Sequence, residues 1–156
     1  MKSRPRSVER EVAKYLSEVF VTLGYSPVRR IPTTGRTGPD ISINEARFVI
    51  DVKSRIEVPK MMVVPDGHVL RYNHFLVALR LKHLSDLLHG TANLTFVEWD
   101  EYSRTVEDWW RHMDEWTQEN EKDAITTLIL HRPRMLISNA ALVMSYSDYQ
   151  NFRRPK

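Results

Sequence analysis

The sequence predicts an α/β fold with a central mixed β-sheet flanked by helices, and three observations support this. An amphipathic helical pattern opens the chain, and a series of short apolar segments separated by Gly, Pro and Asn follows it. Two more apolar segments come after a second long helical pattern. At 156 residues, the chain has the length of one ordinary domain and can bury a sizeable core. We therefore expect a single domain over residues 1–156.

The first half of the chain should form a helix followed by three strands. Apolar residues recur at helical spacing over residues 7–23, with Ser7 as a suitable N-cap and Gly24 as a stop. The next segments are rich in apolar residues and are separated by a Gly- and Pro-containing stretch and by an Asn-Glu-Ala turn. They predict strands at 25–31, 40–43 and 47–53.

The second half has weaker patterns at first and clearer ones later. Turn residues separate two short extended pieces, and a long acidic helix pattern carries three tryptophans and a methionine. Packing in the core or against another subunit is favoured over base stacking for these four residues, because the acids around them would repel phosphate. Ser147 or Asp148 is the expected N-cap of a last short helix. The expected elements are extended pieces at 61–64 and 68–72, a helix at 75–88, a strand at 94–99, a helix at 105–121, strands at 125–130 and 141–146, and a helix at 147–152.

The charge distribution is uneven, although the net charge is only +3. Residues 98–123 carry a net charge of −7, whereas the first 60 residues carry +5 and residues 131–156 carry +4. Arginine outnumbers lysine by sixteen to seven, which suits forked binding of phosphate oxygens. The basic segments are therefore candidates for binding nucleic acid. The composition of residues 98–123 indicates an acidic helical insertion.

Several classes of protein are disfavoured by the composition. The chain has no cysteine, so disulfides and cysteine-based zinc sites are excluded, and its six histidines show no zinc-ligand spacing. No apolar run is long enough to span a bilayer, and the charged start lacks the apolar core of a signal peptide. We expect an intracellular, cytoplasmic protein that does not associate with membranes.

Two acids and a lysine are expected to meet at the strands of the first half. Asp40 follows a Gly-Pro turn, and the apolar run that starts at Phe48 carries Asp51 and Lys53 two positions apart. Side chains alternate along a strand, so Asp51 and Lys53 should share one face, while Ile50 and Val52 point to the other. Two carboxylates suit Mg²⁺, and a neighbouring lysine can orient or deprotonate an attacking water.

Glu9 is a possible third acid. On a helical wheel it lies between Leu16 and Phe20 at the border of the apolar stripe, whereas Glu18 lies on the far side. A buried carboxylate there must be paired, hydrogen-bonded or metal-bound, but at the first turn of a helix it can also remain in water and favour the helix dipole. Both roles stay open from the residues alone.

The first 55 residues resemble a known nuclease family. Ser7-Val-Glu-Arg-Glu-Val12, Leu23-Gly-Tyr-Ser-Pro-Val-Arg29, Gly35 to Asp40 and Ile50-Asp-Val-Lys-Ser54 resemble, in order, the archaeal-type Holliday junction resolvases of the PD-(D/E)xK nuclease superfamily. This resemblance implies a restriction-endonuclease-like core and a metal-dependent active site made of Glu9, Asp40, Asp51 and Lys53. The strand acid is Asp51, where the nearest members of that family usually have Glu.

The resemblance also implies a function. The expected activity is Mg²⁺-dependent hydrolysis of phosphodiester bonds in four-way DNA junctions, with Mn²⁺ able to replace Mg²⁺ and the metal held by Glu9, Asp40 and Asp51. Cutting two opposed strands implies a homodimer. Two alternatives remain: a related endonuclease that acts on linear or flapped DNA, and a noncatalytic DNA-binding protein. The candidates for binding DNA phosphates are Arg10, Arg29, Arg30, Arg36 and Arg55.

Overall fold

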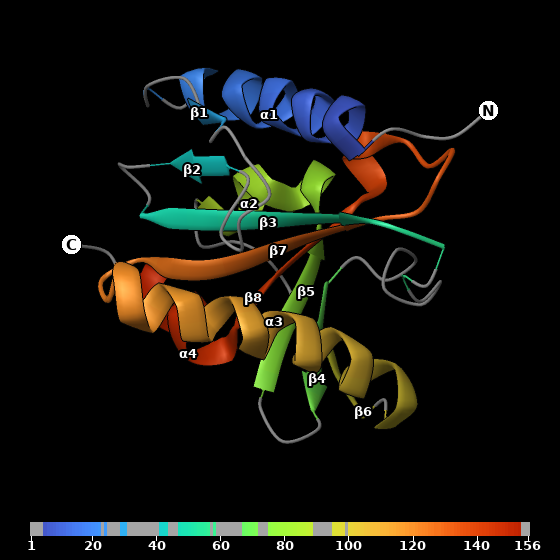
Figure 1. Ribbon diagram of the computed structural model, residues 1–156, viewed down its shortest axis with the longest axis vertical. Coiled ribbons are helices and arrows are strands. Elements are labelled where there is room, and N and C mark those ends of the chain that lie inside the picture. Colours follow the sequence, from blue (N-terminus) through green and yellow to red (C-terminus); the bar gives the residue numbers. More distant parts are fainter. Residues whose placement is uncertain are drawn as a thin grey trace.

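The computed structural model confirms the predicted α/β class, with a mixed sheet and helices packed on both of its faces (Figure 1). This architecture is consistent with a restriction-endonuclease-like core. The structure describes the following residues: 5–22, 24, 29–30, 41–43, 47–56, 58, 67–71, 75–88, 95–98 and 100–153.

In this described part of the chain, eight strands form one sheet in the order β1-β2-β3-β7-β8-β5-β4-β6. Strand β3 runs parallel to β7 and β4 runs parallel to β6, whereas the other neighbours are antiparallel. The long connection between β3 and β7 carries β4, β5 and β6, together with the helical segments at 81–88 and 100–120, before the chain returns to the centre. The strands are β1 (Arg29–Arg30), β2 (Ile41–Ile43), β3 (Phe48–Ser54), β4 (Gly67–Arg71), β5 (Phe75–Arg80), β6 (Thr95–Glu98), β7 (Ile125–His131) and β8 (Ala141–Ser145).

One face of the sheet is covered by α1 (Pro5–Thr22). Its apolar stripe, including Leu16 and Phe20, is buried against Phe48 and Ile50 of β3. The rings of Phe20 and Phe48 meet edge to face, with centroids 6.3 Å apart. Gly24 has a φ of +91° and its amide donates to the carbonyl of Val21, so the helix ends as predicted, at the glycine that tolerates this conformation.

The same core extends under the shorter helices. Buried leucines of η2 (Leu81–His83) and α2 (Leu84–Leu88) join it, as does Tyr149 of α4 (Tyr146–Arg153). The turn η3 (Ile137–Asn139) contacts α1 and precedes β8. Among the described elements, η2, α2 and α4 therefore contribute to the same core as α1.

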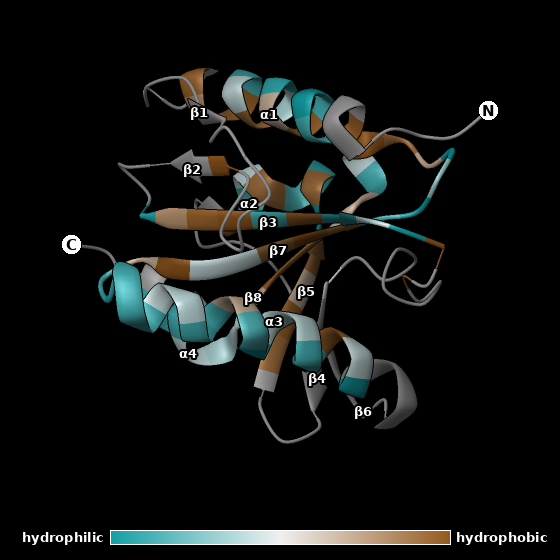
Figure 2. Ribbon diagram, in the orientation of Figure 1, coloured by the Kyte–Doolittle hydropathy of each residue, from teal (hydrophilic) through white to brown (hydrophobic). Residues whose placement is uncertain are grey.

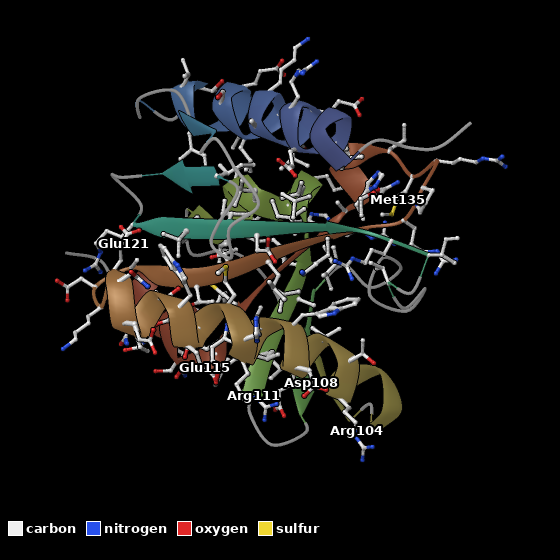
Figure 3. The ribbon with its side chains drawn as sticks, in the orientation of Figure 1. Arg104, Asp108, Arg111, Glu115, Glu121 and Met135 are labelled. Carbon is white, nitrogen blue, oxygen red and sulfur yellow. The ribbon has the colours of Figure 1, made fainter. Side chains whose placement is uncertain are left out.

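The opposite face is covered by α3 (Asp100–Asn120), the acidic helix. Its residues Val106, Trp110 and Met113 are buried in a second core with Leu128 and Leu130 of β7, and Trp109 and Trp116 pack against that core. The preference for core packing at these aromatic positions is thus confirmed. Figure 2 shows hydrophobic residues along the central strands and hydrophilic residues along the outer side of α3. In Figure 3 the labelled side chains of that outer side point away from the sheet; they are Arg104, Asp108, Arg111 and Glu115.

Three predictions about secondary structure are wrong. Ser7 is not the N-cap of the first helix, because α1 begins at Pro5 and Ser7 lies inside it. Proline suits a helix start, since its missing N–H would have no partner within the helix there. Residues 75–88 do not form one helix, because Phe75–Arg80 is strand β5 and helix begins only after it. Four successive residues of β5, from Leu76 to Leu79, are buried, and a strand buried on both faces shows the unbroken apolar run that also fits a helix. The N-cap of α4 is Ser145 rather than Ser147 or Asp148, since the Ser145 hydroxyl accepts from the Asp148 amide at 3.0 Å.

The remaining expected elements lie close to their predicted positions, except for the extended piece at 61–64, which lies outside the described residues. Over the described segments, no helix combines the length and the hydrophobicity that crossing a membrane requires.

Candidate active site

The alternation of side chains along β3 places Asp51 and Lys53 on the face that α3 covers. Ile50 is buried in the core beneath α1, and Val52 packs against that same core. Asp51 is paired in register with Leu128 of β7, which belongs to the core beneath α3. The prediction that Asp51 and Lys53 share one face, opposite to Ile50, is therefore confirmed.

Asp51 and Lys53 form an ion pair at the edge of the core. The Lys53 Nζ lies 3.2 Å from Asp51 Oδ2, and the two side chains are 17% (Asp51) and 22% (Lys53) exposed. Partial burial strengthens this interaction relative to an exposed pair, because less water screens it. Both side chains thus keep part of their surface open to solvent.

Asp40 lies outside the described residues, but its chain neighbour is described. Ile41 begins β2 and pairs with Ile50, the residue before Asp51, in an antiparallel register. The predicted meeting of Asp40 with Asp51 stays a prediction.

The structure does not bring Glu9 to the ion pair. Glu9 is partly buried on α1, beside Val8 and Val12, so it borders the core as the helical wheel predicts, and Glu18 is exposed. However, α1 packs on the face of the sheet opposite to Asp51.

The candidate arginines are spread over several elements. Arg10 is exposed on α1, and Arg29 and Arg30 form β1, paired with Ser42 and Ile41 of β2. Arg55 follows β3, is exposed, and has its guanidinium carbon 6.0 Å from the centroid of a Trp109 ring. This cation–π contact holds Arg55 against α3, on the same face as the ion pair. Arg36 lies outside the described residues.

A hydrogen-bonded pair that the sequence did not reveal joins the C-terminal ends of β3 and β7. Ser54 Oγ lies 2.8 Å from His131 Nδ1, and His131 Nε2 lies 2.9 Å from the Met135 carbonyl oxygen. Because a carbonyl only accepts, Nε2 carries the hydrogen, and in the neutral ring the Ser54 hydroxyl donates to Nδ1. The buried imidazole thus ties the strand end that carries Lys53 to its neighbour.

Arg132 extends this connection to the segment that follows β3. Its Nη1 donates to the carbonyl oxygens of Ile56 and Val58, at 2.8 and 2.6 Å, and the Arg55 amide donates to the His131 carbonyl. The partners lie more than 70 residues apart in the chain, so no local pattern could have identified them.

Shifted pKa values occur away from this site. Burial, together with the nearby Asp114, raises the pKa of Asp148, although its hydrogen bond with Ser145 and the charge of Arg47 oppose the rise. Arg47 precedes β3, whereas Lys53 lies near its C-terminal end, so about 20 Å of strand separates the two regions. Burial, assisted by Glu18, also raises the pKa of Tyr15.

The carboxylate of Asp51 fits one ligand position of a Mg²⁺ ion. It is a hard oxygen donor with access to solvent, and Mg²⁺ commonly uses one or two carboxylates and completes its coordination with water and phosphate oxygens. Among the described residues no group of three or more His, Asp or Glu side chains could hold a metal ion. A protein site would therefore combine Asp51 with residues outside the described set, of which Asp40 is the candidate.

Comparison with known proteins gives no significant match to a family model, to a curated protein or to a solved structure.

Proposed function

We propose that this protein is a metal-dependent endonuclease that cuts four-way DNA junctions by hydrolysing phosphodiester bonds. The observation that carries the proposal is the partly buried ion pair of Asp51 and Lys53 on a core strand. The segment resemblance described above supports it, because an acid and a lysine at these two strand positions are what that nuclease family uses. The start of β2 directly after Asp40, opposite β3, adds further support.

Asp51 and Asp40 would hold the metal ion, and Glu9 is the less direct candidate because its helix covers the other face. When bound, a divalent cation polarises the scissile phosphate and lowers the pKa of a coordinated water. Lys53 donates hydrogen bonds through its ammonium group to the attacking water or to a phosphate oxygen, and its charge offsets the negative charge that develops there. Asp51 keeps the lysine oriented through their 3.2 Å contact.

DNA binding would rely on phosphate contacts and on the shape of the junction. Arg55 lies on the same face as the ion pair and is held by Trp109, which makes it a candidate for binding the phosphate next to the scissile bond. Arginine matches phosphate oxygens with paired donors but reads no sequence through them. Two opposed strands must be cut to resolve a junction, so the active form would be a symmetric dimer.

The test is cleavage of a labelled four-way junction beside a linear duplex of the same sequence, with Mg²⁺, with Mn²⁺ and with a chelator. Paired, symmetric nicks in the junction alone, lost with the chelator, are the expected result. The resemblance implies 5′-phosphate and 3′-hydroxyl ends, so DNA ligase should reseal the nicks. Comparable cutting of the duplex would indicate an endonuclease that is not specific for junctions. Binding without any cutting would indicate a noncatalytic DNA-binding protein.

A matched pair of variants makes this test specific. Asp51→Asn removes the candidate metal ligand, whereas Asp108→Asn removes the acid of an exposed ion pair with Arg111 that has the same 3.2 Å separation. Asp51→Asn should lose cleavage and retain junction binding, and Asp108→Asn should retain both. Equal activity of the two variants would show that Asp51 is not part of the active site.

A further inference from the structure

Arg134 has an uncommon backbone conformation in an exposed turn. Its φ is 72°, in the left-handed region that glycine favours, and the residue is exposed. The Met135 amide donates to the Arg132 carbonyl at 3.1 Å, which closes a tight turn with Pro133 and Arg134 in the middle. Proline at the second position and a positive φ at the third are features of a type II turn, where glycine or asparagine is usual at the third. An arginine at this position therefore strains the backbone.

Both ends of this turn are bonded to the rest of the molecule. The buried His131 donates from Nε2 to the Met135 carbonyl oxygen at 2.9 Å. Arg132 donates from Nη1 to the carbonyl oxygens of Ile56 and Val58, at 2.8 and 2.6 Å. A strained residue persists where the surrounding structure fixes it in this way. A side chain on such an ordered turn also loses less entropy when it binds a ligand.

The same histidine joins the turn to the end of β3. The Ser54 hydroxyl lies 2.8 Å from His131 Nδ1, and the Arg55 amide donates to the His131 carbonyl at 2.9 Å. Ser54 and Arg55 directly follow Lys53 in the chain. The turn that carries Arg134 therefore lies at the end of the sheet where the candidate ion pair is located.

The charge of these two segments is positive on balance. Up to residues 58 and 136, the segments after β3 and β7 contain three arginines and one acid, Glu57, which lies outside the described residues. Arg132 binds carbonyl oxygens, and Arg55 contacts the ring of Trp109. The Arg134 guanidinium has two candidate partners, which are the carboxylate of Glu57 and an anion of the substrate.

We propose that Arg134 binds a backbone phosphate of the DNA substrate, close to the phosphate on which the Asp51–Lys53 pair acts. This inference rests on the proposed function and adds a residue to its DNA-binding surface. A guanidinium offers paired donors that match phosphate oxygens, and such contacts position DNA without reading its sequence. An ion pair of an exposed arginine contributes little to stability, so pairing with Glu57 would not offset a strained backbone.

Arg134→Gly separates binding from stability. Glycine adopts a positive φ without strain, so this variant should be at least as stable as the wild type. Its affinity for a labelled four-way junction, measured by fluorescence anisotropy with a chelator, should fall about fivefold to tenfold at about 0.1 M salt. The slope of log affinity against log salt concentration should become shallower by about 0.9, the value of one phosphate contact. Arg134→Lys keeps the charge and should retain most of that slope.

Arg47→Gly is the matched control. Arg47 is also an exposed arginine with a positive φ, 58°, but it precedes β3 and so lies at the other end of that strand. Its replacement makes the same change of charge and relieves a similar strain. Junction affinity and salt slope should stay at their wild-type values. An equal loss of affinity in the two glycine variants would show that net charge and not position matters, and would overturn the proposal.

A purely structural role of Arg134 predicts other results. If the guanidinium served only an ion pair with Glu57, Arg134→Gly and Glu57→Gln would both lose that pair and neither would bind the junction less tightly. Unchanged affinity and salt slope in Arg134→Gly would therefore overturn the phosphate contact, whatever its stability.

Failure of this contact and failure of the proposed function give different results. If the wild type cuts junctions with Mg²⁺ and Arg134→Gly binds them equally well, the nuclease stands and the contact is refuted. If the wild type binds junctions through Arg134 but never cuts them, the contact is supported and the enzyme is refuted. No junction binding by the wild type would refute both.

Discussion

Asp51→Asn separates the catalytic role that we propose for the Asp51–Lys53 pair from its contribution to stability. A bound metal ion stabilises the transition state by several kcal/mol, and about 4 kcal/mol corresponds to about a thousandfold in rate. Replacing a carboxylate ligand with a neutral amide should therefore reduce junction cleavage by about a thousandfold. The amide keeps the size of the side chain, and its oxygen can still accept a hydrogen bond from Lys53.

The stability cost of the same change should be small by comparison. Exposed ion pairs contribute about 0–1 kcal/mol, and breaking a fully buried pair costs about 3–5 kcal/mol. About a fifth of each side chain is exposed here, so we expect a loss of about 1–2 kcal/mol in the free energy of unfolding. In a chain of this length that loss lowers the unfolding midpoint by about 2–8 °C.

The assay combines single-turnover cleavage of a junction with urea denaturation of the same preparations. Asp108→Asn, in an exposed pair of equal separation, should change the free energy of unfolding by about 0.5 kcal/mol or less and should cut at the wild-type rate. The reasoning fails if Asp51→Asn cleaves within tenfold of wild type. It also fails if its activity loss disappears once the rates are corrected for the folded fraction.

Three further predictions concern stability and can be checked by denaturation. His131→Phe deprives Ser54 and the Met135 carbonyl of their partner in a buried setting, so the free energy of unfolding should fall by about 1–3 kcal/mol. Leu128→Ala removes a fully buried side chain beneath α3 and should cost about 2–5 kcal/mol, whereas an unchanged value would mean that this core is loosely packed. Asp148 has a raised pKa in the folded state, so the folded protein binds its proton more tightly than the unfolded chain does. Its contribution should therefore fall as the pH rises from the ordinary aspartate pKa through the raised value, and subtracting the Asp148→Asn curve from the wild-type curve should isolate this fall.

Local patterns predicted most elements of the fold but not their arrangement. Helices α1 and α3 each bury one apolar stripe and expose the rest, so their sequences carry a clear helical period. Strand β5 is buried on both faces and lacks the alternation that marks a strand, which explains why the apolar pattern of 75–88 favours a helix. The position of β7 between β3 and β8 depends on pairing between residues more than 70 positions apart in the chain, which a local sequence pattern does not predict.

The candidate site shows the same limit at the level of single residues. Asp51 and Lys53 are two positions apart on one strand, so their shared face follows from backbone geometry wherever the strand lies in the sheet. The helical wheel correctly places Glu9 beside the core, but it reports only which side of the helix meets the sheet and not which face of the sheet the helix covers. The structure puts α1 and Asp51 on opposite faces. Hence an acid at the border of a helix's apolar stripe is evidence only about burial. An acid and a lysine on the same face of one strand are known to lie close together, so experiments on catalysis should start from Asp51 and Lys53.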